Sequence, residues 1–150
     1  MGIDDLDRRL IEALQQDARA PLKTLAERVG LSSPSVSDRL HRLEARGIVR
    51  GFGVEIEPQA LGYGLQALVR IRPLPGKQHM VRKLIEETPE ICECDKVTGE
   101  DCYVARLFVS SMDELDRIVD RIAEKAVTNT AIVKSQLIAR RAPPLGARGA

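Results

Sequence analysis

The sequence predicts an α+β protein of two domains, a helix-turn-helix unit followed by a ferredoxin-like domain of element order βαββαβ. Up to residue 46 the apolar residues recur every three or four positions, as on helices, whereas beyond Gly64 strand-like alternation and helical stretches follow each other. Between the two parts lies a run with Pro58 and two glycines, which is typical of a domain boundary. The predicted division is residues 1–57, a hinge at 58–63, a second domain at 64–139 and a flexible tail at 140–150.

The first two predicted helices are short, and both have recognisable ends. Asp4 or Asp5 can cap the first helix, which ends around residues 16–19, and Pro21 suits the first turn of the second. Gly30 can adopt the left-handed conformation that ends the second helix. The apolar residues expected to pack together are Leu6, Leu10, Ala13 and Leu14 from the first helix and Leu22, Leu25, Ala26 and Val29 from the second.

The third predicted helix has a narrow apolar stripe of Val36, Leu40 and Leu43, which leaves most of its surface free. Ser32 and Ser33 offer hydroxyl caps, and with Ser33 as the cap Pro34 takes the first helical position. Gly47 is expected to end the helix. Three helices with a glycine-containing connection before the third form the helix-turn-helix arrangement, whose last helix enters the major groove of double-stranded DNA.

The free flank of this third helix is basic. It holds three arginines, and a guanidinium can contact phosphates or guanine edges. Residues 19–51 contain seven basic and three acidic residues, although the net charge of the chain is only +1. Arg39 lies nearest the apolar stripe and can either brace the domain or reach a phosphate, whereas Arg42 is better placed for base edges or backbone. The predicted DNA-binding residues are Ser32, Ser33, Ser35, Ser37, Asp38, Arg39, His41, Arg42 and Arg46. Taken alone, the same flank is also consistent with an ordinary solvated helix face.

Residues 48–57 are rich in β-branched residues and glycine, so they predict one or two short strands that end at Pro58. The tail from Arg140 has few apolar residues and several arginines without an acidic residue, which indicates a flexible segment. A DNA contact by this tail has only weak support.

The second domain is predicted to have strands at residues 65–72, 91–97, 102–109 and 130–138. Its first helix carries a stripe of Val81, Leu84 and Ile85, and its second begins with a Ser111-x-x-Glu114 capping box. In the resulting fold both helices cover one face of a four-stranded antiparallel sheet, and no helix remains for the other face. An uncovered sheet face with apolar residues favours self-association, so a homodimer through these sheets is expected.

Composition and motifs exclude several functions. There is no Trp, with only two Tyr and two Phe, so an aromatic platform for single-stranded nucleic acid is not expected. The three cysteines, Cys92, Cys94 and Cys102, do not match zinc-site spacings, and no phosphate loop or nucleophile–base pair is visible. The sequence therefore predicts no catalytic residue, no metal and no cofactor. An odd cysteine count without a signal peptide or an apolar span predicts a cytoplasmic protein with no membrane partner. The predicted DNA binding adds that it is nucleoid-associated.

Four segments also resemble one known family: LDRRLIEALQQDARAPLKTLAERVGLS, SVSDRLHRLEARGIVRGF, EPQALGYG and VTGEDCYV. Their combination, which spans about residues 3–137, is similar to the Lrp/AsnC family of leucine-responsive, or feast/famine, transcriptional regulators. The resemblance implies a winged helix-turn-helix, an extended hinge that pairs with its twin, and a ferredoxin-like effector and oligomerisation domain. It also implies dimers that assemble into tetramers, octamers or discs, with small amino acids bound between dimers.

By the same resemblance, the turn of Thr98, Gly99, Glu100, Asp101 and Cys102 lines or supports an effector pocket. The family often reads Gly-x-x-Asp-aromatic here, whereas Cys102 occupies the usual acid position in this chain. Three interpretations are consistent with this difference: Asp101 takes over the role of that acid, the effector is a different molecule, or no effector binds. A carboxylate on the turn can hold an ammonium group, and the Gly99 amide can approach a carboxylate closely. Without the resemblance, the same residues describe a good hairpin turn.

The sequence as a whole predicts a sequence-specific DNA-binding transcriptional regulator that a small amino acid or related metabolite modulates through its assembly. The alternative is a small ferredoxin-like metabolite-binding or assembly protein without sequence-specific DNA binding. Salt-dependent retention on DNA would separate the two.

Overall fold

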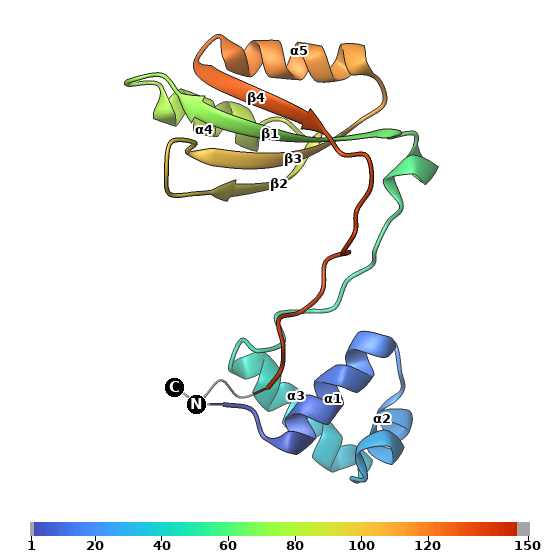
Figure 1. Ribbon diagram of the computed structural model, residues 1–150. Coiled ribbons are helices and arrows are strands. Elements are labelled where there is room, and N and C mark those ends of the chain that lie inside the picture. Colours follow the sequence, from blue (N-terminus) through green and yellow to red (C-terminus); the bar gives the residue numbers. More distant parts are fainter. Residues whose placement is uncertain (1, 147–150) are drawn as a thin grey trace. The chain divides into compact units, whose positions relative to one another are not determined.

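The computed structural model describes residues 2–146 (Figure 1). The chain divides into two compact units: Ile56–Ala139 forms one, and the residues up to Glu55 together with the segment from Arg140 form the other. The boundary thus lies two residues before the expected one. Among the described residues, no helix is long and apolar enough to cross a membrane.

The first unit consists of three helices, α1 (Asp5–Gln16), α2 (Leu22–Val29) and α3 (Ser33–Ala45), as the apolar spacing predicts. Its core includes side chains from all three, of which Leu10, Leu25 and Leu43 are almost completely buried. Burial of this kind contributes about 1.5–3 kcal/mol for each large aliphatic side chain. The segment from Arg140 was expected to be a flexible tail, yet Leu145 packs against this core, because burying a large aliphatic side chain is favourable.

Both ends of α3 depend on single residues. Ser32 rather than Ser33 is the N-cap, so the helix begins one residue earlier than expected and Pro34 is its second residue. Proline is tolerated there because the first helical N–H groups have no intrahelical acceptor. Gly47 ends the helix with a φ of 69°, and the Ile48 amide donates back to the Leu43 carbonyl at 2.9 Å, as the sequence predicts.

The strands predicted within residues 48–57 are absent from the described structure. The prediction of short strands for the wing is therefore wrong for the single chain. A strand needs a neighbour to accept its backbone hydrogen bonds, and no described segment pairs with this one. Phe52, Val54 and Ile56 alternate along it and are exposed, Val54 to 85%. The hinge that follows contains a 3₁₀ turn, η1 (Pro58–Leu61).

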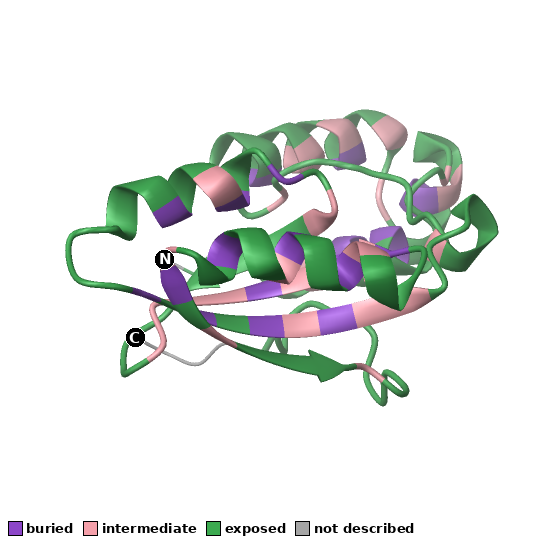
Figure 2. Cartoon of the chain, turned by 90° about the horizontal axis from the view of Figure 1, so that it is seen from above, coloured by how far each residue is buried: buried purple, intermediate pink, exposed green. Residues whose placement is uncertain are grey.

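The second unit has the predicted βαββαβ order: β1 (Leu65–Pro73), α4 (Gln78–Glu86), β2 (Ile91–Lys96), β3 (Tyr103–Val109), α5 (Met112–Ala123) and β4 (Ala126–Ile132). The strands lie in the order β2-β3-β1-β4, and every neighbouring pair is antiparallel. Both helices cover the same face of the sheet (Figure 2). The helix-turn-helix unit and the ferredoxin-like unit together confirm the predicted α+β fold.

Two details of this unit differ from the expectation. Strand β4 occupies residues 126–132 instead of 130–138. It pairs antiparallel with β1, from Ala126 opposite Pro73 to Ile132 opposite Ala67, and β1 extends only two residues beyond that last pair. Leu137 and Ile138, which suggested the longer strand, are exposed, Leu137 to 95%. The capping box of α5 is also shifted: Ser111 accepts from the Glu114 amide, but the Glu114 carboxylate accepts from Ser110.

The two faces of the sheet differ sharply. The face beneath the helices carries almost fully buried aliphatic residues, among them Val69, Ile71 and Leu107. The opposite face mixes half-buried apolar residues with charged ones. Register places Leu68 opposite Arg106 and Gln66 opposite Phe108 on that face. Strand β2 forms one edge of the sheet and contains a bulge between Ile91 and Glu93.

Candidate nucleic-acid interface and effector turn

The outer surface of α3 is polar and exposed along most of its length. Asp38, His41 and Arg42 are exposed, whereas Ser33, Ser37 and Arg39 are half-buried. Two hollows border this surface. One, of about 300 Å³, lies between α3 and the chain's first residues, and a more open one, of about 650 Å³, is lined by Leu31, Ser35, Asp38, Arg39, His41 and Arg42.

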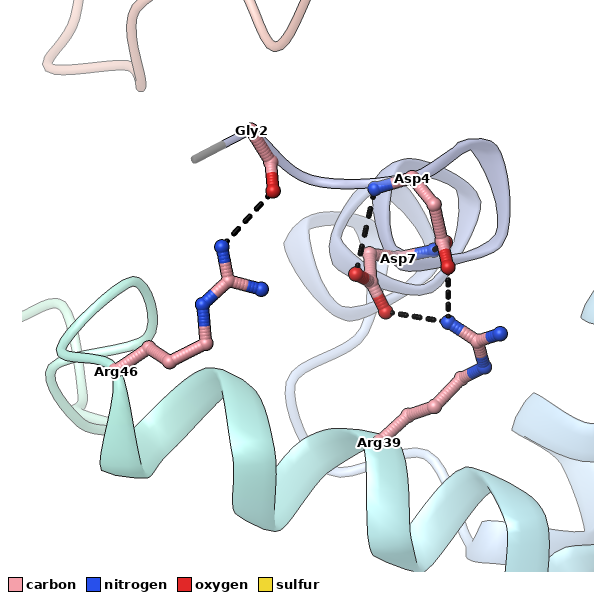
Figure 3. A network of polar contacts seen from close by, with 5 residues as sticks. All are labelled: Gly2, Asp4, Asp7, Arg39 and Arg46. Carbon is pink, nitrogen blue, oxygen red and sulfur yellow. Dashed lines mark hydrogen bonds and ion pairs between the residues drawn. The ribbon is translucent and has the colours of Figure 1, made fainter.

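Arg39 is bound by the first helix (Figure 3). Its Nη1 atom donates to Asp4 Oδ2 at 2.7 Å and to Asp7 Oδ1 at 2.8 Å. These bonds raise the pKa of Arg39, and the bond from Arg39 holds the pKa of Asp4 below its ordinary value of 3.8. The guanidinium side chain is 18% exposed. Of the two roles expected for Arg39, this geometry supports the brace.

Asp4 and Asp7 also organise each other. The Asp7 amide donates to Asp4 Oδ1 at 2.7 Å and the Asp4 amide donates to Asp7 Oδ2, so the two residues form a capping box at the start of α1. Each carboxylate therefore uses one oxygen for the helix start and the other for Arg39. The Asp-x-x-Asp spacing was visible in the sequence, but its partner on α3 was not.

Arg46 is bound as well. Its Nη2 atom donates to the Gly2 carbonyl oxygen at 2.8 Å (Figure 3). Arg39 and Arg46 stand seven residues apart on one flank of α3, and both turn toward the segment that leads into α1. That segment and this flank line the smaller hollow together.

Arg42 lies between these two arginines and differs from them. It is exposed and lines both hollows, and its guanidinium has no hydrogen bond or ion pair with any residue that the structure describes. Ser32 and Ser35 are partly engaged, since their hydroxyl oxygens are 2.9 Å apart. Within the described part of the chain, this exposed flank thus offers the unbound guanidinium of Arg42, which can donate to phosphates and base edges, beside His41 and the Asp38 carboxylate, which can accept from a base amino group.

The turn between β2 and β3 is the second candidate site. Gly99 has a φ of 108°, and the Val97 amide donates to the Cys102 carbonyl at 2.9 Å, which closes the turn. Its acidic residues lie near arginines of β1: Arg70 Nη1 is 4.0 Å from Asp101 Oδ2, and Arg72 Nη1 is 3.8 Å from Glu100 Oε2. Sequence reasoning missed these two arginines, because they are brought to the turn by the pairing of β1 with β3, two strands about thirty residues apart in the sequence.

The cysteines have no shared site. All three are free, and Cys92 and Cys94 are exposed. Partial desolvation of the Cys94 thiol, together with the neighbouring Asp95 carboxylate, raises the pKa of that thiol. Among the residues described, no group of three or more His, Cys, Asp or Glu side chains is arranged to hold a metal ion.

Comparisons with known proteins match both units. Residues 3–44 match the profile of the AsnC-type helix-turn-helix domain, and residues 66–143 match that of the Lrp/AsnC ligand binding domain. The HTH-type transcriptional regulator LrpA of Mycobacterium tuberculosis is 40% identical over 130 residues, which cover 86% of this chain and 87% of that protein.

Solved structures agree with the match. LrpC of Bacillus subtilis superposes with a TM-score of 0.87 at 25% identity and covers 93% of this chain and 100% of its own. The feast or famine regulatory protein of M. tuberculosis, solved in complex with L-methionine, has a TM-score of 0.84 at 36% identity, with coverage of 93% and 97%.

Proposed function

The chain belongs to the Lrp/AsnC family of transcriptional regulators, and we propose that α3 is the helix with which it reads double-stranded DNA in the major groove. The observation that supports this most directly is the position of Arg42, exposed and unbound among the described residues, on the outer flank of that helix. An arginine at such a place can bind guanine O6 and N7 in a bidentate manner. Asp38, His41 and Ser35 surround it and complete the proposed contact surface.

A single short helix reads too few base pairs for specificity, so the proposal includes a homodimer. Two symmetry-related α3 helices would occupy half-sites about 34 Å apart. The open face of the sheet, with Leu68 and Phe108, supplies apolar area for the dimer contact. The alternating, exposed residues of 52–56 lie on an unpaired extended segment, which suits a strand that pairs with its counterpart in the second copy. Tetramers or octamers would extend this assembly.

We further propose that the turn of residues 98–102 takes part in binding a small amino acid. The support is chemical: Asp101 and Glu100 can receive an ammonium group, and Arg70 and Arg72 beside them can receive a carboxylate. L-Methionine, which a relative of known structure binds, is the first ligand to test. The effector acts only if it binds one assembly state more tightly than another.

The experiment that tests the central proposal is a selection. Duplexes are enriched from a random library with the purified chain, and the affinity for the enriched duplex is compared with that for a scrambled duplex of the same composition at several salt concentrations. A ratio well above one supports sequence-specific reading. Equal, weak affinities would favour the alternative, a metabolite-binding or assembly protein without specific DNA contacts.

The proposal gives the chain no catalytic role, since its family consists of transcriptional regulators. It also locates the chain on chromosomal DNA in the cytoplasm, which fluorescence microscopy of a tagged copy would examine.

A further inference from the structure

We infer that Asp4 and Asp7 keep Arg39 away from the DNA, so that Arg39 is a positioning residue that sets α3 on α1 and is not a phosphate contact. The inference rests on the proposed DNA-binding function of α3. It concerns a residue of the recognition helix whose type and place on the flank would otherwise assign it to DNA.

The geometry commits Arg39 to both carboxylates. One nitrogen, Nη1, donates to Asp4 at 2.7 Å and to Asp7 at 2.8 Å, and Asp7 is only 7% exposed. Charge-assisted bonds of this length are about twice as strong as neutral ones. A DNA phosphate could recruit the guanidinium only by leaving the buried carboxylate of Asp7 without its cation, which is costly.

The position of Arg39 nevertheless permits a DNA contact once the carboxylates release it. Its side chain borders both hollows, the inner one with Asp4 and Asp7 and the outer one with Arg42 and His41. A rotation of the side chain from the inner hollow to the outer one would add a second arginine to the flank. The two aspartates thus hold in place a charge that would otherwise strengthen binding to every sequence alike.

This arrangement has a functional consequence. A phosphate contact raises the affinity for all DNA and carries no sequence information. Chromosomal DNA offers a vast excess of non-specific sites, so each extra contact lengthens the time spent on wrong sequences. Binding Arg39 internally limits that loss and fixes the rotation of α3, on which the placement of Arg42 depends.

The test is a double-mutant cycle in which the affinity of each variant for a scrambled duplex is measured at several salt concentrations. Asp4→Asn/Asp7→Asn keeps the shape and the helix cap but removes both charges. It should raise the affinity at 100 mM salt about three- to tenfold and steepen the slope of log affinity against log salt by about one, as one added phosphate contact does. Arg39→Met in the native background should leave the slope unchanged, because Arg39 contacts no phosphate there.

The same neutralisation in the Arg39→Met background separates contact from general electrostatics. In the Arg39→Met background, neutralising Asp4 and Asp7 should leave the salt slope unchanged. A slope that still steepens would mean that the lost charges act on DNA through space, and the inference would be overturned. Glu12→Gln/Glu27→Gln is the matched control, since both side chains are exposed and lack an ion pair with any described residue. It removes two acidic charges from the same unit without releasing an arginine.

The positioning role of Arg39 is tested by measuring affinity for the duplex that the native chain enriches. Arg39→Met should lower the affinity for that duplex several-fold while the scrambled duplex is unaffected, and Arg39→Lys, whose ammonium can donate to both carboxylates, should restore it. If Arg39→Met instead lowers the salt slope of the native protein, Arg39 contacts phosphate and the inference is wrong. If the native chain retains no duplex in a salt-dependent way, the proposed function itself fails, and the inference with it.

Discussion

Asp7 and Arg39, 32 residues apart in the chain, are joined by a 2.8 Å hydrogen bond that connects the first helix of the DNA-binding unit to the third. Asp7 is one of two buried polar residues in the described structure, the other being Thr88. Buried polar groups are retained where hydrogen bonds satisfy them. The Asp7 carboxylate accepts one bond from the Asp4 amide and one from Arg39, and the second of these also holds α3 to α1.

The first prediction concerns the stability of this connection. Asp7→Ala removes the acceptor of Arg39 and half of the capping box, so it should lower the free energy of unfolding by about 1–3 kcal/mol. Urea denaturation followed by circular dichroism measures this. Asp5→Ala, which removes an exposed acid paired with Arg8 on the same helix, should cost about 1 kcal/mol or less. Equal losses for the two variants would contradict the structural role given to Asp7.

A second prediction follows from the lowered pKa of Asp4, whose largest cause is the hydrogen bond from Arg39. A carboxyl group with a lower pKa in the folded than in the unfolded state contributes stability that is fully present above its unfolded value, near 3.8, and is lost as the pH falls through the folded value. The free energy of unfolding, measured from pH 7 to pH 3, should therefore show an acid loss that Asp4→Asn reduces. Identical pH profiles for the two proteins would refute this.

The third prediction tests Arg42 as a base-reading residue. Arg42→Ala should weaken binding to the enriched duplex by roughly 1–3 kcal/mol and leave the scrambled duplex much less affected. Fluorescence anisotropy at fixed salt gives both affinities. Arg117→Ala, which removes the same charge from an exposed position of α5, is the control for net charge. A parallel loss on both duplexes with a shallower salt slope would reassign Arg42 to phosphate.

The fourth prediction concerns the open face of the sheet. Leu68→Glu places a charge among Phe108 and the other half-buried residues of that face, so it should shift the protein from dimer to monomer in sedimentation equilibrium. Met112→Glu, an equal change at an exposed position on the helix side, should leave the mass unchanged. If neither variant alters the mass, the dimer contact lies elsewhere.

The fifth prediction addresses the effector turn. If Asp101 supplies the acid that Cys102 does not, titration calorimetry should detect L-methionine binding to the native chain and an affinity at least tenfold lower for Asp101→Asn. Glu100→Gln, which changes the neighbouring and more exposed acid, should have the smaller effect. Heat of binding that appears only in Cys102→Asp would show that the turn needs its acid at that position.

The sequence allowed the helices to be predicted closely, because their signals are local. Gly47 ends α3 as expected, and the spacing of Leu10, Leu25 and Leu43 defines the core of the first unit. The errors arose where a long-range partner decides the outcome. The strands expected at residues 48–57 have no pairing partner among residues 2–146. The position of β4 is set by its pairing with β1 and not by the apolar residues 137 and 138.

The candidate site shows the same division. Helical periodicity placed three arginines on one flank, and the structure keeps them there. Periodicity could not show which of the three arginines is available, because Arg39 and Arg46 are bound by residues that precede them in the chain by more than thirty positions. The Asp-x-x-Asp motif suggested a helix start and gave no sign of its second role.

The bulge in β2 has a consequence for aggregation. β2 is an edge strand, and beside its bulge it carries three exposed charged residues, Glu93, Asp95 and Lys96, which make it a poor template for another strand. In the sheet that the structure describes, the other edge is β4. Fibre growth needs two different edges that join head to tail, whereas β4 against β4 is a two-fold contact that closes after two copies. The described sheet is thereby protected from open-ended growth through its edges.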